Sequence, residues 1–113
     1  MKHVKLRPRT IKVLGRTYVC SYEPALNLGV NNVGQCDNAN MVIHILDGQH
    51  PVEEADTLIH ELLHALWFIM SIDQGGVDEE AVVRRLASGL IGVFLDNPEL
   101  LVYLQSIKNH SLK

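Results

Sequence analysis

The stretch "TLIHELLHALW", residues 57–67, decides how the rest of the sequence is interpreted. It places His60 and His64 four positions apart, with Glu61 directly after the first histidine. The surrounding positions are almost all apolar and recur at helical spacing. These positions are Leu58, Leu62, Leu66 and Ile69, joined by Ile59, Leu63 and Met70. The pattern predicts a helix that is apolar nearly all round and therefore central in the fold.

Two explanations exist for polar side chains in such a helix: a His–Glu–His cluster hydrogen-bonded within the core, or a metal site. Residues four apart on a helix point the same way, so His60 and His64 can offer two ring nitrogens to one cation. Glu61 is rotated by about 100° from His60 and reaches a metal-bound water more readily than the metal itself. Because unpaired polar groups are costly to bury, we favour a metal, Zn²⁺.

A catalytic zinc usually takes a third protein ligand and keeps one position open. The acidic and histidine candidates downstream are Asp73, Asp78, Glu79, Glu80, Asp96 and His110. Glu79 and Glu80, at the start of the next predicted helix, are both candidates for the third ligand, and periodicity alone does not favour either. Each acid is also explained as a solvated group that complements the helix dipole. Cys20 or Cys36 would be available as a fourth ligand if the site were closed.

The sequence ahead of the helix predicts β structure. Residues 10–23, "TIKVLGRTYVCSYE", contain two runs rich in β-branched and aromatic residues, and Gly15-Arg16 between them indicates a hairpin. Residues 23–40 are rich in Asn, Gly and Pro and predict a loop. Residues 41–46, "MVIHIL", predict a short strand.

Three helices are predicted after the strands. Pro51 suits the first position of the central helix. Asp78 suits the N-cap of a second helix that runs to about Leu95, with Val77 and Val82 as a hydrophobic staple. A third helix follows Asn97 and ends near residue 109. The fold class is therefore α+β, with a small N-terminal antiparallel sheet of about three strands packed on three helices in one domain, residues 1–113.

Composition limits the classes of partner. The chain has 113 residues, 47% hydrophobic residues and a net charge of −3, which is typical of an ordinary globular domain. The charge favours neither nucleic acid nor an anionic membrane as partner. The basic residues near the start are interpreted as a solvated strand edge. Two cysteines and no signal-like or spanning segment predict a cytoplasmic protein with inert thiols. The oligomeric state is left open.

The motif resembles a known family. "HELLHALW", residues 60–67, followed by "EEAVVRRLA", residues 79–87, is similar to the zincin metallopeptidases, and among them to the gluzincins. The closest resemblance is to small phage and prophage proteins and to ImmA/IrrE-type peptidases. In that family a glutamate on the following helix is the third ligand, with a small residue three positions later and an alanine seven positions later. Glu80, with Val83 and Ala87, matches this spacing better than Glu79 does, whereas Arg84 departs from the Asn or Asp usual at its position.

The resemblance implies a zinc-dependent metallopeptidase that hydrolyses a peptide bond in a specific cytoplasmic protein, such as a repressor. His60, His64 and Glu80 would hold Zn²⁺, and Glu61 would activate the zinc-bound water. The strand at 41–46 would border the cleft and take an extended peptide alongside it. His44, Tyr22 and Arg84 are all open as oxyanion donors. The alternative is a non-catalytic zincin-scaffold zinc protein that acts as a phage or prophage binding or regulatory module.

Overall fold

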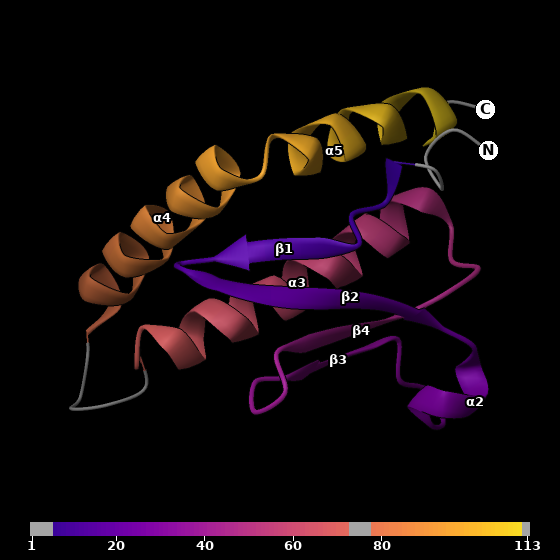
Figure 1. The fold of residues 1–113 in the computed structure, drawn as a ribbon, viewed down its shortest axis with the longest axis horizontal. Helices are drawn as coiled ribbons and strands as arrows, with labels where there is room; N and C mark the ends of the chain where they lie inside the picture. The colour runs from indigo at the N-terminus through magenta and orange to yellow at the C-terminus, as the bar shows by residue number, and fades with distance from the viewer. Residues whose placement is uncertain (1–5, 73–77, 112–113) are drawn as a thin grey trace.

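The structure is a computed structural model that describes residues 6–72 and 78–111. Four strands form one mixed sheet in the order β1-β2-β4-β3: β1 Thr10–Val13, β2 Arg16–Glu23, β3 Gly34–Asp37 and β4 Val42–Leu46 (Figure 1). Parallel pairing joins β2 to β4, and the other two pairs are antiparallel. The helices are α2 Ala25–Leu28, α3 Pro51–Ile69, α4 Glu79–Asp96 and α5 Pro98–Ser111. The predicted α+β class is confirmed, with four strands instead of about three. The prediction of an antiparallel sheet is wrong for one pair, because β2 and β4 run parallel.

The first hairpin forms where the sequence predicts it, with a small shift of the turn. Leu14 and Gly15 both have positive φ, at 50° and 86°, between the paired strands β1 and β2. A two-residue turn with two positive φ angles matches the right-handed twist of the strands it joins. The turn is therefore Leu14-Gly15, one residue earlier than the predicted Gly15-Arg16.

The prediction of a loop over residues 23–40 is wrong in two places. The segment contains the short helix α2 and the strand β3. The sequence "GQCD" of β3 lacks the alternation that signals a strand, and it becomes one because β4 lies beside it. The backbone N–H of Leu46 donates to the carbonyl oxygen of Val33 at 2.9 Å, which begins this pairing. As a result β3 is an edge strand of the sheet and β4 an inner strand.

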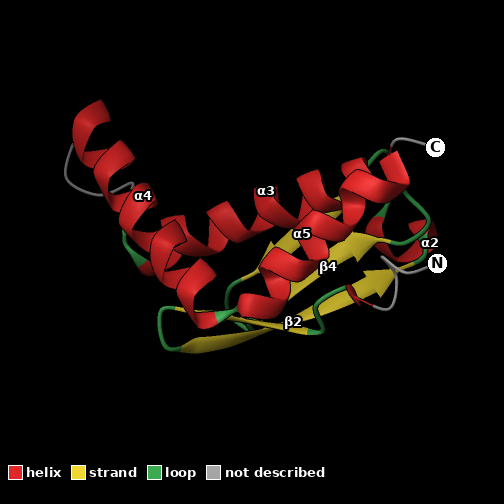
Figure 2. Ribbon diagram, turned by 90° about the horizontal axis from the view of Figure 1, so that it is seen from above, coloured by secondary structure: helices red, strands yellow, loops and turns green. Residues whose placement is uncertain are grey.

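All three long helices lie on one face of the sheet, and none of the helices that the structure describes covers the opposite face (Figure 2). Helix α3 begins at Pro51 as predicted, and the ring Nδ1 of His50 accepts from the N–H of Val52 at 3.3 Å. Asp78 caps α4, since its Oδ1 accepts from the N–H of Ala81 at 2.9 Å. Val77, the other member of the predicted staple, lies outside the described residues.

The core lies between the inner face of the sheet and α3. Ile43 and Ile45 point inward from β4, and Leu58, Leu62 and Leu66 meet them from α3, all fully buried. Further members come from β1, β2, α4 and α5: Ile11, Val13, Tyr18, Val93, Leu100 and Tyr103. This packing fixes α3 across the sheet. Within the described ranges, no helix is long and apolar enough to cross a membrane.

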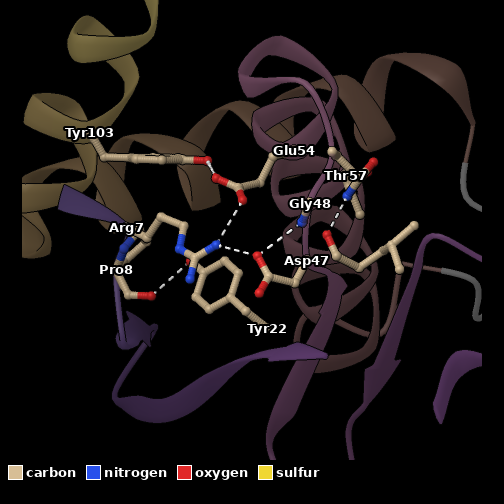
Figure 3. A network of polar contacts seen from close by, with 10 residues as sticks. Arg7, Pro8, Tyr22, Asp47, Gly48, Glu54, Thr57 and Tyr103 are labelled. Carbon is tan, nitrogen blue, oxygen red and sulfur yellow. Dashed lines mark hydrogen bonds and ion pairs between the residues drawn. The ribbon is translucent and has the colours of Figure 1, made fainter. Parts of the chain in front are cut away.

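A buried polar network anchors the first half of α3 (Figure 3). Glu54 is 1% exposed. One carboxylate oxygen lies 3.2 Å from the Nη1 atom of Arg7, and the other accepts from the hydroxyl of Tyr103 at 2.7 Å. The same Arg7 nitrogen lies 2.8 Å from Asp47, and its guanidinium carbon is 4.0 Å from the centre of the Tyr22 ring. The network ties the N-terminal segment and α5 to α3.

We expect Arg7→Met to lower the free energy of unfolding by about 3 kcal/mol, because it leaves the buried Glu54 carboxylate without its cation. Chemical denaturation measures the change. Arg9→Met is the matched control, since Arg9 is exposed. Equal losses for the two variants would contradict a structural role for the network.

Candidate functional site

A cavity of about 920 Å³ lies between α3 and the edge strand β3. Helix α3 contributes Asp56, Thr57, His60, Glu61, His64, Trp67 and Phe68, and Ser71 follows it. The other wall consists of Gly34, Gln35 and Cys36 of β3, with Asn31, Asn32, Val33 and Asn38 from the flanking loops. The three polar residues of the helix motif therefore share one cavity.

His60 and His64 lie next to each other on successive turns of α3. Their ring centroids are 5.0 Å apart and their planes are inclined by 67°. The side chain of His60 is 66% exposed, and His64 is exposed as well. These imidazoles are therefore accessible from solvent and are not packed among aliphatic groups. Their placement on one helix face follows from the four-residue spacing.

Glu61 is the unusual member of the motif because it is buried and has no hydrogen-bonding partner in the described part of the chain. Its side chain is 9% exposed and lines the cavity. Among the described residues, the polar contact of its carboxylate is with the Nε2 atom of His60, 4.0 Å from Oε2, which is too long for a hydrogen bond. Most buried polar groups in folded proteins do have a partner, so an exception requires an explanation.

Gly34 gives Glu61 its position against β3. A Cβ atom on Gly34 would lie 2.7 Å from Cγ2 of Thr57 and 3.0 Å from Oε2 of Glu61. Only glycine permits so close an approach of strand and helix. The expectation that residues 41–46 border the cleft is therefore wrong: β4 lies inside the sheet, and β3 borders the cavity.

The two cysteines occupy different environments. Cys36 lines the cavity, and its thiol donates to Oδ1 of Asn38 at 3.3 Å. Burial, with a smaller contribution from the negative charge of Glu61, raises the pKa of the Cys36 thiol to about 11. Cys20 belongs to the core cluster, where burial raises its pKa to about 12. Of the two, Cys36 alone faces the candidate site.

The structure does not bring the predicted third ligand to the histidines. Glu79 and Glu80 are both exposed in the first turn of α4, and neither lines the cavity. Across residues 6–72 and 78–111, no three His, Cys, Asp or Glu side chains are arranged to hold a metal ion. Asp73 lies outside the described residues, and so does the side chain of His110. The choice of Glu80 stays a prediction.

None of the three candidate oxyanion donors lines the cavity. His44 pairs with Glu23 on the neighbouring strand β2, and it alternates with the inward-pointing Ile43 and Ile45. The hydroxyl of Tyr22 donates to the carbonyl oxygen of Pro8 at 2.9 Å. Arg84 is exposed on α4. Each of these three side chains is therefore hydrogen-bonded to another group or lies outside the cavity.

Beyond the histidines, the solvent-exposed face of α3 carries aromatic side chains. Trp67 is 38% exposed and Phe68 58% exposed. The helix is therefore not buried on every side, although its sequence is apolar nearly all round. A second, smaller cavity of about 360 Å³ is lined by His60, His64, Leu63, Trp67 and Leu86. The sequence did not predict that asparagines line the cavity, because isolated amides in loops give no periodic signal.

We expect Gly34→Ala to lower the free energy of unfolding by about 1–3 kcal/mol, because the new methyl group overpacks the contact with α3. Thr57→Ser removes the Cγ2 atom that the methyl group would meet and should restore part of the loss in the double variant. Thermal or chemical denaturation measures both. Gln35→Ala, at the exposed neighbouring position, is the control. If Gly34→Ala left stability unchanged, the close approach would be refuted.

Comparison with known proteins gives no match to a protein-family model, to a curated protein or to a solved structure.

Proposed function

We propose that the protein is a zinc-dependent metallopeptidase whose reaction takes place in the cavity between α3 and β3. The observation that carries the proposal is the carboxylate of Glu61, which is nine-tenths buried, faces the cavity and lacks a hydrogen-bond donor among the described residues. A general base must be free to take a proton, so a base that is already paired would be unsuitable. The resemblance of the motif to the zincins agrees with this assignment.

The donor set of the cavity fits zinc. Two accessible imidazoles on adjacent turns are ligands that zinc accepts, and Glu61 lies between them in sequence without pointing to the same helix face. His60 and His64 would hold the ion. Glu80 is the proposed third ligand by resemblance, and it would have to approach from α4. Bound zinc would supply a Lewis acid that polarises the scissile carbonyl and acidifies a water molecule.

The proton transfers of the reaction would then be carried out by Glu61. Glu61 would accept the proton of the attacking water at a carboxylate oxygen and later deliver it to the leaving amine. The burial of Glu61 strengthens the electrostatic interaction of its carboxylate with that water. The close approach of Gly34 to the carboxylate limits the positions that the Glu61 side chain can take.

The free edge of β3 offers a place for an extended peptide. Bonded and non-bonded pairs alternate along an antiparallel ladder. Val33 and Leu46 form a hydrogen-bonded pair of the β3–β4 ladder, so the pairs made by Gly34 and Cys36 are non-bonded ones. The backbone N–H and C=O groups of Gly34 and Cys36 therefore point away from β4. The N–H of Gly34 makes a long bond of 3.4 Å to the side chain of Asn32. A substrate strand would pair with these groups. The exposed rings of Trp67 and Phe68 favour apolar substrate side chains nearby.

A second candidate function is a non-catalytic zincin-scaffold protein that binds a partner. One observation favours it: within the described ranges, no third ligand joins the two imidazoles. A zinc held by two histidines alone would be weak, and such a protein would work through its surface. The two candidates differ in whether Glu61 is needed.

We expect the purified chain to bind one zinc ion. His60→Ala or His64→Ala should weaken binding by roughly 100-fold or more, because a lost ligand costs more than a lost orienting group. Competition with a fluorescent zinc chelator measures the affinity. His50→Ala is the matched control, since His50 lies at the start of the same helix and outside the cavity.

Zinc-loaded protein should cleave members of a proteome-derived peptide library, with new termini identified by mass spectrometry. Glu61→Gln should keep the zinc affinity and lower the cleavage rate by roughly 10²–10⁴-fold, the usual contribution of a general base. Zinc binding without any cleavage by the wild-type chain would refute the peptidase and support the binding module. Failure to bind zinc would refute the metal site itself.

A further inference from the structure

We infer that Asn38 is the oxyanion donor of the site: its Nδ2 group donates a hydrogen bond to the carbonyl oxygen of the peptide bond that is attacked. The inference rests on the proposed function. It assigns a role that His44, Tyr22 and Arg84 leave vacant, because none of them lines the cavity.

The carboxamide of Asn38 is held in one orientation by two donors. Its Oδ1 atom accepts from the hydroxyl of Tyr18 at 2.8 Å and from the thiol of Cys36 at 3.3 Å. Both donors keep their protons at neutral pH, since burial raises the pKa of Cys36 to about 11 and raises the pKa of Tyr18 above its ordinary value. In this orientation the hydroxyl and the thiol both donate to the amide oxygen. The oxygen is therefore fixed toward the sheet.

The same two bonds leave the nitrogen of the amide available. In the part of the chain that the structure describes, no acceptor pairs with Nδ2 of Asn38, and Asn38 lines the cavity that contains Glu61 and both histidines. A donor that is oriented before the substrate arrives stabilises developing negative charge without reorganising. A neutral amide also does not form an ion pair with the Glu61 carboxylate, as a cationic donor would.

The other amides of the cavity lack this combination. Nδ2 of Asn32 already donates to the carbonyl oxygen of Leu28 at 3.0 Å. Asn31 and Gln35 are exposed, and no hydrogen bond among the described residues fixes either side chain. Among the described residues that line the cavity, only Asn38 has an anchored amide oxygen and an amide nitrogen without an acceptor. The anchoring also explains why Cys36 is present as a thiol at this wall: it positions the amide.

Acetohydroxamate bound to the zinc-loaded full-length chain tests the inference, because its carbonyl oxygen takes the place of the scissile carbonyl oxygen. Asn38→Asp keeps an oxygen for Tyr18 and Cys36 but removes the two N–H donors. Asn31→Asp adds the same charge at the same cavity and is the matched control. We expect Asn38→Asp to weaken acetohydroxamate binding by roughly tenfold more than Asn31→Asp does, with zinc affinity similar in both variants.

Nuclear magnetic resonance supplies a readout that a merely structural role would not change. In the wild-type chain, acetohydroxamate should shift the side-chain amide resonances of Asn38, whereas those of Asn31 should shift less. Equal binding by the two variants, or unshifted Asn38 resonances in a complex that forms, would overturn the inference and leave the zinc site standing. If zinc binds and acetohydroxamate does not, the donor role is likewise overturned. If zinc does not bind, the proposed function fails and this inference fails with it.

Discussion

Two buried glutamates share one face of α3, and they differ in whether the fold supplies partners for their carboxylates. Glu54 and Glu61 are seven residues apart, nearly two full turns, and both are buried. Glu54 is surrounded by Arg7 and Tyr103, so its burial is compensated within the fold. Glu61 has no such compensation among the described residues. The contrast between a carboxylate with two partners and one that faces a cavity without any in the described part of the chain is the basis of the function proposed for Glu61.

The architecture explains how this difference is maintained. The first half of α3 is covered by the N-terminal segment and α5, which carry the partners of Glu54 (Figure 3). The second half lies against β3, the edge strand, where glycine at position 34 brings the backbone close and offers no side-chain donor. The histidines then lie on an open face, and the asparagines of the loops that flank β3 complete the polar wall. The polar network of Glu54 and the proposed site therefore lie at opposite ends of one helix.

Local signals in the sequence were sufficient for much of this fold. Pro51 and Asp78 mark helix starts because their effect depends on one turn of backbone, and Gly15 marks a hairpin for the same reason. The strand β3 could not be found in this way, since "GQCD" becomes a strand only through its pairing with β4. The motif placed His60, Glu61 and His64 together, because helix geometry links positions four apart. The role of Gly34 and of Asn38 depends on contacts between distant segments, and no spacing rule reaches them. The position of Glu80 relative to the histidines depends on the chain between α3 and α4, which lies partly outside the described residues.

The most direct test compares two conservative substitutions in the metal-free protein. Glu61→Gln replaces an unpaired buried charge with a neutral group, so it should raise the free energy of unfolding, by about 1 kcal/mol. Glu54→Gln removes the charge that Arg7 pairs with at a position on the same helix face, so it should lower that free energy by about 2 kcal/mol. Urea denaturation in the presence of a chelator measures both. If Glu61→Gln destabilises the protein as much as Glu54→Gln does, then Glu61 is a satisfied structural residue, and the central claim of this account is wrong.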